Sequence, residues 1–224
     1  MMINNFYYPT LVRQNIAAYY KEEGVFYATY NCEKNYRNIS EDCQYRCVYC
    51  DARIDECGGE RFSLDHFRPL DVFSNKFDGI LKIHPFNLHL SCQKCNVLKT
   101  NDWKGCEDTI DGVTFKSKLG YVDRFQEDIS KYIVVDNDGV ITSIDSNGPG
   151  DYMVRKLLLN RTNRVYIRKR RIVKEKAARV LELLLIKQAV LMNLDEMSYN
   201  EYKEEMKKLI NLFDRFKNLN LLKV

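Results

Sequence analysis

Two C-x-x-C units constrain the fold of this chain more than any other feature of its sequence. They are CVYC (Cys47, Cys50) and CQKC (Cys92, Cys95), separated by a span much longer than the knuckle spacing of a zinc ribbon. Each pair can turn two sulfurs toward one ion, so the four thiolates can close a tetrahedral Zn²⁺ site. The pairs therefore predict one structural zinc that clamps a small, loop-rich unit at both ends.

Alternatives for the cysteines remain open from the sequence. The two pairs could be buried thiols without a metal, or a redox motif, although a redox role is disfavoured because both pairs belong to one small unit. Cys43 lies four residues before Cys47 and could take its place as a ligand. The remaining cysteines also lack paired spacing, and we assign them no function: Cys32, Cys57 and Cys106.

Composition sets the broad class of protein. The chain has 224 residues, of which 45% are hydrophobic and 29% charged, as is typical of a soluble globular protein with one large or two small domains. No apolar run approaches the roughly 18 residues that span a bilayer, and MMINNFYYPT does not resemble a signal peptide. We therefore expect a cytoplasmic protein with no membrane partner, whose eight cysteines stay reduced and available to metal.

Local patterns divide the chain into four segments. They are an N-terminal helical segment, a metal-braced core, a linker with a β-hairpin and a C-terminal helical region, over residues 1–42, 43–106, 107–150 and 151–224. In the first segment, the pattern predicts a helix that begins near Pro9 and ends at Gly24. In the third, the runs KYIVV and GVITSI flank an Asp-Asn-Asp turn and predict a hairpin.

A carboxylate and an imidazole stand side by side between the cysteine pairs. The segment RFSLDHFRPL (61–70) is a strand-like apolar run that ends in Asp65 and His66 and is stopped by Pro69. An isolated histidine is more often a hydrogen-bonded core residue than a catalytic one, and an isolated aspartate is more often a turn cap. Only the motifs that surround Asp65 and His66 can favour a catalytic role for them.

Two further segments complete a strand, strand, helix order. HPFNLHLSC (84–92) supplies Asn87 before a second short apolar run. CQKCNVLKTND (92–102) then places Asn96 and Lys99 at helical spacing after the second cysteine pair. The sequence thus predicts a ββα arrangement within an α+β protein.

These motifs together resemble those of the HNH, or ββα-metal, endonuclease family. The family pattern is C-x-x-C, then Asp-His, then Asn, then C-x-x-C-[HN]-x-x-K, and every element occurs in order over roughly residues 43–102. Asn96 stands where many members carry histidine, so the chain would be an H-N-N variant. The combined motifs are far more specific than any one of them.

The resemblance implies a role for each signature residue. His66 would be the general base, Asp65 and Asn96 would hold one Mg²⁺ or Mn²⁺ ion, and Asn87 would fix the loop and the imidazole orientation. The chemistry agrees, because imidazole can deprotonate water near neutral pH and hard oxygen ligands suit these ions. The implied reaction is phosphodiester hydrolysis, with DNA as the expected substrate.

For other residues near this centre the sequence supports only weaker predictions of a role. Lys99 and Arg68 are close enough in sequence to contact phosphate, although either could simply be solvated. His84 and His89 fall outside the signature, and we treat both as structural or substrate-contacting.

The C-terminal region carries a basic helical segment. The pattern predicts helices near 151–159, over 162–193 and from 198 to about 218, the last of which opens with a capping box. Basic residues of 160–179 can neutralise several phosphates, among them Arg164, Arg168 and Arg171. A solvated helix face or a docking surface for an acidic partner explains them equally well.

The later part of the long helix is apolar. Residues 178–192 are apolar nearly all round, which predicts burial against the last helix and leaves open a further contact with another subunit.

A second resemblance rests on the order of four motifs within 43–171, namely DHFRP, NLHLSCQKCN, DNDGVI and LLLNRTNRVYIRKRR. This order resembles that of the PtuB-type HNH nucleases of the Septu and retron anti-phage systems, which work beside a separate ATPase subunit. The likeness implies a defence effector whose C-terminal helices dock such an ATPase.

Two rival functions remain open from the sequence. One is an HNH toxin that cleaves RNA or tRNA, since these centres recognise phosphate geometry more than the sugar. The other is a non-catalytic zinc-knuckle module that binds nucleic acid or a partner. Asp65 and His66 favour an enzyme, because a binding module has no need of a carboxylate beside a base.

Overall fold

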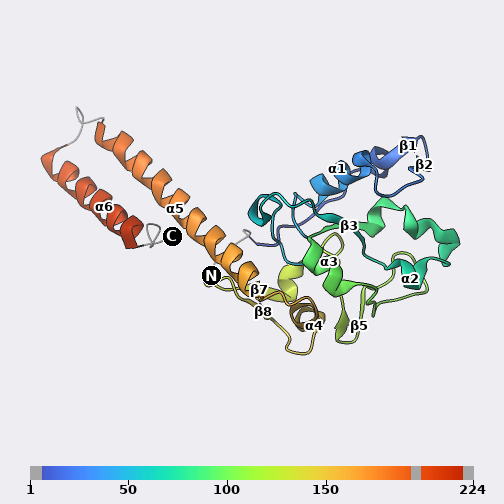
Figure 1. The fold of residues 1–224 in the computed structure, drawn as a ribbon. Helices are drawn as coiled ribbons and strands as arrows, with labels where there is room; N and C mark the ends of the chain where they lie inside the picture. Colours follow the sequence, from blue (N-terminus) through green and yellow to red (C-terminus); the bar gives the residue numbers. More distant parts are fainter. Residues whose placement is uncertain (1–6, 193–197, 219–224) are drawn as a thin grey trace. The chain divides into compact units, whose positions relative to one another are not determined.

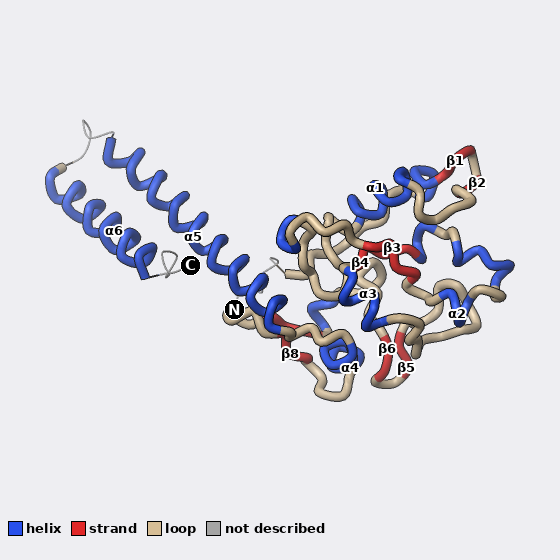
Figure 2. Tube along the Cα trace, viewed as in Figure 1, coloured by secondary structure: helices blue, strands red, loops and turns tan. Residues whose placement is uncertain are grey.

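The strands of this protein are short, and each pairs with a single neighbour. The computed structural model describes residues 7–192 and 198–218, and the chain divides into two units, Met1–Val165 and Tyr166–Val224. Over the described ranges, four antiparallel two-stranded sheets and several helices make an α+β structure with a helical C-terminus (Figure 1). Loops connect most elements of the first unit (Figure 2).

The elements of the first unit follow one another closely. Strands β1 to β8 span Tyr20–Glu22, Val25–Phe26, Ser63–His66, Leu88–Ser91, Phe115–Lys116, Leu119–Gly120, Ile133–Val135 and Ile141–Ser143. Helices α1 to α4 span Glu33–Asp42, Leu70–Phe73, Gln93–Lys99 and Pro149–Lys156. The 3₁₀ helices η1 to η5 span Ile16–Tyr19, Asp55–Cys57, Phe77–Lys82, Pro85–Asn87 and Ile129–Lys131.

The predicted helix from near Pro9 to Gly24 is wrong. This stretch contains only the single turn of η1, capped by the side chain of Asn15, and then β1. Gly24 has a φ of 73° and lies in the turn between β1 and β2, where a left-handed residue is needed. The first α-helix is α1, which the sequence did not indicate because most of its buried side chains are polar: Asn35, Asn38, Ser40 and Asp42, with Ile39.

β3 and β4 form the pair on which the centre of the first unit is built. Asp65 lies opposite His89, and His66 opposite Leu88. All four side chains of β4 are buried. α3 begins directly after β4 and contacts β3, so one face of α3 lies beside the end of β3 that carries Asp65 and His66 (Figure 1).

The predicted hairpin in the linker is confirmed as β7 and β8, with Val135 opposite Ile141. The carboxylate of Asp136 accepts hydrogen bonds from the backbone N–H groups of Asp138 and Val140, both at 2.9 Å. Asp136 therefore closes the turn through its side chain. The predicted helix after the hairpin is also confirmed as α4.

The second unit consists of most of α5 (Thr162–Met192) and of α6 (Tyr199–Asn218), both of which the sequence predicted. The predicted end of the long helix at residue 193 lies outside the described residues. The capping box is confirmed: Ser198 N donates to Glu201 Oε2 at 2.8 Å, and Glu201 N donates to Ser198 Oγ at 3.4 Å. Lys187 of α5 pairs with Glu205 of α6.

Burial of the apolar part of α5 is less complete than predicted. Leu181, Leu183, Leu185 and Ile186 are between 43% and 58% exposed. The single helix α6 can cover one stripe of α5 and leaves its other faces open. The expectation of burial is therefore wrong for these four residues within one chain. Among the described residues, no helix combines the length and apolar character needed to cross a membrane.

Candidate metal centre and active site

The two C-x-x-C units meet in space. The sulfurs of Cys47, Cys50, Cys92 and Cys95 lie within 4.8 Å of one another, and all four residues are buried. Cys92 is also the residue that caps the start of α3. This four-cysteine cluster is consistent with a structural zinc site that joins the turn after α1 to the start of α3.

Cys43 is not part of the cluster. Its sulfur accepts a hydrogen bond from the backbone of Leu90 at 3.4 Å, on the β4 side of the core. The alternative in which Cys43 replaces Cys47 as a ligand therefore does not hold in this structure.

Two arginines surround the cysteine cluster. Arg161 donates hydrogen bonds from Nη2 to the sulfurs of Cys92 and Cys95 at 3.6 and 3.4 Å. Hydrogen bonds from the neighbouring cysteines, first Cys47, lower the pKa of the Cys92 thiol, and a hydrogen bond from Arg164 adds to the effect. Four thiolates around a divalent ion leave an excess of negative charge, which the guanidinium groups offset. The two arginines thus favour a thiolate at Cys92, whereas burial raises the pKa of the Cys47 thiol.

His66 is held at the end of β3 with a defined ring orientation. Its Nε2 lies 3.0 Å from the backbone carbonyl oxygen of Lys82, and its ring packs edge-on against Tyr30 with centroids 4.5 Å apart. A carbonyl can only accept, so Nε2 carries the proton and Nδ1 keeps the free lone pair of the neutral ring. Burial lowers the pKa of His66 below its ordinary 6.5. The imidazole is therefore neutral at pH 7 and able to accept a proton.

Asp65 is fixed by two side chains. The ammonium of Lys99 lies 3.2 Å from Asp65 Oδ2, and the hydroxyl of Tyr49 donates to the same carboxylate. Lys99 also donates to the carbonyl of His66 at 2.9 Å. The side chain of Lys99 is fully buried, which corrects the expectation that it contacts phosphate. Its role is to link α3 to the end of β3.

Asn87 clamps the backbone that follows His66. Its Oδ1 accepts from Arg68 N at 2.8 Å, and its Nδ2 donates to the carbonyls of Arg68 and Leu81 at 3.1 and 2.9 Å. The Asn87 carbonyl also accepts from Phe67 N at 2.8 Å. The Asn87 amide thus ties the end of β3 to the segment before β4.

A pocket of about 410 Å³ brings several of the predicted residues together. Asp65, His66 and Asn96 all line it, as does Tyr30, whose ring packs edge-on against that of His66. Asn87 does not line this pocket and acts from behind it, through the backbone. The pocket therefore combines a neutral imidazole, an anchored carboxylate and a half-buried amide.

The arginines predicted to contact nucleic acid are buried. Arg68 donates to the carbonyls of Ile110 and Gly112 at 2.8 and 2.6 Å and lies over the ring of Trp103. Arg164, Arg168 and Arg171 are each at most 6% exposed. Contact with phosphate or a partner needs open side chains, so burial argues against it for Arg68 and Arg164, which both lie in the first unit. For Arg168 and Arg171, which lie in the second unit, the contact stays a prediction.

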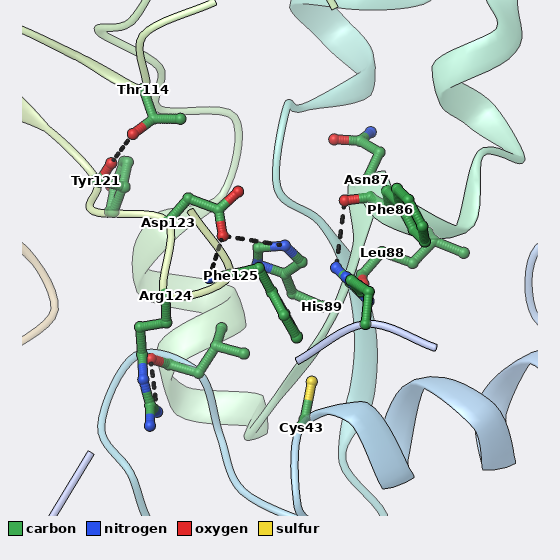
Figure 3. Close-up of polar contacts among 12 residues, drawn as sticks. Cys43, Phe86, Asn87, Leu88, His89, Thr114, Tyr121, Asp123, Arg124 and Phe125 are labelled. Atoms are coloured by element: carbon green, nitrogen blue, oxygen red, sulfur yellow. Dashed lines mark hydrogen bonds and ion pairs between the residues drawn. The ribbon is translucent and has the colours of Figure 1, made fainter. Parts of the chain in front are cut away.

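The other two histidines lie away from the pocket of His66. His84 accepts a hydrogen bond from Phe86 N at 3.2 Å and caps η4. His89 is stacked on Phe67. Its Nε2 lies 3.8 Å from Asp123 Oδ1, and Figure 3 shows these two side chains facing each other. Burial holds the pKa of His89 well below its ordinary value. Both are structural residues in this arrangement.

Sequence reasoning missed the two tyrosines of this site. Tyr30 lies in the segment before α1, and Tyr49 lies inside the first C-x-x-C unit. The chain has 15 tyrosines, and neither position has a motif that marks it. Only the folded arrangement relates Tyr30 to His66 and Tyr49 to Asp65.

Comparisons with known proteins give no family for this chain. No protein-family model, no curated protein sequence and no solved structure matches it. Its function must therefore be argued from the site.

Proposed function

We propose that this protein is a metal-dependent endonuclease of the HNH type that hydrolyses phosphodiester bonds in DNA. The observation that carries the proposal is the setting of His66. Its Nε2 is occupied by the carbonyl of Lys82, so Nδ1 is the nitrogen that accepts a proton from the attacking water. Burial lowers the pKa of the ring and keeps it in the base form at neutral pH.

Asp65 and Asn96 would hold the catalytic ion. They line the same pocket as His66 and offer a carboxylate and an amide, the oxygen donors that Mg²⁺ or Mn²⁺ accepts beside water and phosphate oxygens. The bound ion would supply Lewis-acid stabilisation of the phosphate and the leaving oxygen. Lys99 and Tyr49 orient the Asp65 carboxylate, and Asn87 holds the backbone at His66.

The order of elements supports the same family. β3, β4 and α3 follow one another as the HNH resemblance implies, and the four-cysteine cluster fastens the start of α3. In this proposal the three elements form a zinc-braced ββα-metal core. A zinc-knuckle binding module would need the cluster but would not need the pocket with Asp65 and His66.

The resemblance to PtuB-type nucleases extends the proposal to an effector of bacterial anti-phage defence. An ATPase subunit would then dock on the C-terminal helices. The exposed apolar residues of α5 from Leu181 to Ile186 support a docking role, because single chains rarely leave several large apolar side chains of one helix open.

Cleavage assays test the nuclease directly. The purified protein is incubated with plasmid, single-stranded DNA and tRNA, with added Mg²⁺ or Mn²⁺ or with neither, and with or without a co-encoded ATPase. His66→Ala should lower the DNA cleavage rate roughly 100-fold or more, while zinc content and the fold are kept. His84→Asn is the matched control, since an asparagine can still accept from Phe86 N, and it should cleave as the wild type does.

The outcomes separate the rival functions. Cleavage of tRNA alone would favour the RNA-cleaving toxin. Unchanged cleavage by folded His66→Ala, or binding without any cleavage by the wild type, would leave the zinc-knuckle module as the better interpretation.

A further inference from the structure

A second cleft adjoins the pocket of His66. It has a volume of about 340 Å³ and shares three lining residues with that pocket: Tyr30, Leu64 and Asn96. The two clefts are therefore adjacent, and both are lined by residues of β3 and α3. Tyr30 stands at the junction, with its ring against His66.

Tyr36 and Arg61 also line this second cleft, and they do not line the pocket of His66. The guanidinium carbon of Arg61 lies 4.0 Å from the centre of the Tyr36 ring, so the two planes make a stack. Arg61 is also fixed by Glu33, whose carboxylate lies 2.9 Å from Nη2. The side chain of Arg61 is 60% exposed, so its outer face is open to a ligand.

The lining of the cleft suits a nucleobase better than a phosphate. Within the described chain, Arg61 is its only charged lining residue, and Glu33 already balances that charge. The other polar groups include the amides of Asn31 and Gln93, which can both donate and accept at the edge of a heterocycle. Tyrosine rings and guanidinium planes are the surfaces on which unpaired bases stack.

We propose that the cleft over Tyr36 and Arg61 binds an unpaired nucleobase next to the phosphodiester held at His66, so that the substrate is a single-stranded DNA segment. The identity of the ligand as DNA rests on the proposed nuclease function. In a duplex both faces of each base are covered by stacking and its pairing edge is taken. Only an unpaired or flipped base can occupy the cleft.

Binding is measured by fluorescence anisotropy of the full-length protein with Ca²⁺ in place of Mg²⁺, using one labelled oligonucleotide as a single strand and as a duplex. Tyr36→Leu removes the ring, and Arg61→Lys keeps the charge but removes the plane. Each should weaken single-strand affinity roughly five- to hundredfold, the effect of losing one stacked base, and change duplex affinity less than twofold. Arg53→Lys is the matched control, an exposed arginine paired with Asp55 outside the cleft, and should bind as the wild type does.

The results for binding and cleavage are read separately. Equal losses for single strand and duplex, or no loss in either variant, would overturn the inference even if the protein cleaves DNA. Selective loss of single-strand affinity in a protein that cleaves nothing would support the base-binding cleft and overturn the nuclease. Arg61 lies at an exposed position, so Arg61→Lys keeps the test valid if Tyr36→Leu does not fold.

Discussion

Removal of the Asn87 amide should destabilise the first unit strongly. Asn87 is 4% exposed and makes three hydrogen bonds to backbone groups, one with an N–H and two with carbonyls. In Asn87→Ala the N–H of Arg68 loses its partner, at a cost of roughly 1–3 kcal/mol, and each carbonyl loses a bond worth about 1 kcal/mol. We expect a loss of about 4 kcal/mol in the free energy of unfolding.

The single tryptophan offers a local probe of this change. Trp103 is 7% exposed and packs against Phe67 and Arg68, next to the backbone that Asn87 holds. Urea unfolding followed by Trp103 fluorescence should show a lower midpoint for Asn87→Ala with an unchanged slope. Thermal unfolding should shift down by roughly 8–16 °C for about 4 kcal/mol in a chain of this size.

Two further variants decide whether the lost hydrogen bonds cause the lower stability of Asn87→Ala. Asn87→Asp keeps the shape and the acceptor for Arg68 N but turns an oxygen toward two carbonyls, so it should be at least as unstable as Asn87→Ala. Asn147→Ala, at an exposed turn position, should change stability by less than about 0.5 kcal/mol. Wild-type stability of Asn87→Asp, or a loss below about 1 kcal/mol in Asn87→Ala, would refute the reasoning.

Two other predictions concern the metal and the base. Elemental analysis should find one zinc per chain. Cys92→Ser should lose the zinc and lower the unfolding temperature of the first unit, whereas the control Cys32→Ser should keep the zinc and the wild-type unfolding temperature. Full zinc content in Cys92→Ser would remove that residue from the ligand set. Because burial lowers the pKa of His66 and the base acts when neutral, kcat/KM for DNA should fall as the pH is lowered, with the midpoint of the decline below pH 6.5. A midpoint at or above pH 6.5 would contradict this.

The parts of the structure that the sequence predicted are those with a local signal. The spacing within each C-x-x-C unit limits where its two sulfurs can point, and the capping box of Ser198 and Glu201 needs only four residues. The hairpin around Asp136 is likewise set by its turn. Each of these features is determined by neighbours in the chain, so a single sequence contains the necessary information.

The missed parts depend on contacts between distant segments. α1 buries polar residues such as Asn38, whose amide donates to Ala18 O at 2.8 Å, and this bond is invisible to hydrophobic periodicity. Lys99 was expected at the surface because lysine usually is, yet Asp65 lies 34 residues away in the chain and pairs with it. The same holds for Arg68, whose partners are the carbonyls of Ile110 and Gly112.

A connection between the cysteine cluster and the pocket follows from these contacts. A pair of four-residue strands is marginal on its own, so β3 and β4 need support from elsewhere. The cluster fixes Cys92 at the start of α3, and α3 in turn places Asn96 in the pocket and Lys99 against Asp65. Loss of a metal bound at the cluster would therefore release α3, and with it the orientation of the Asp65 carboxylate, even though no cysteine is among the described residues that line the pocket of His66.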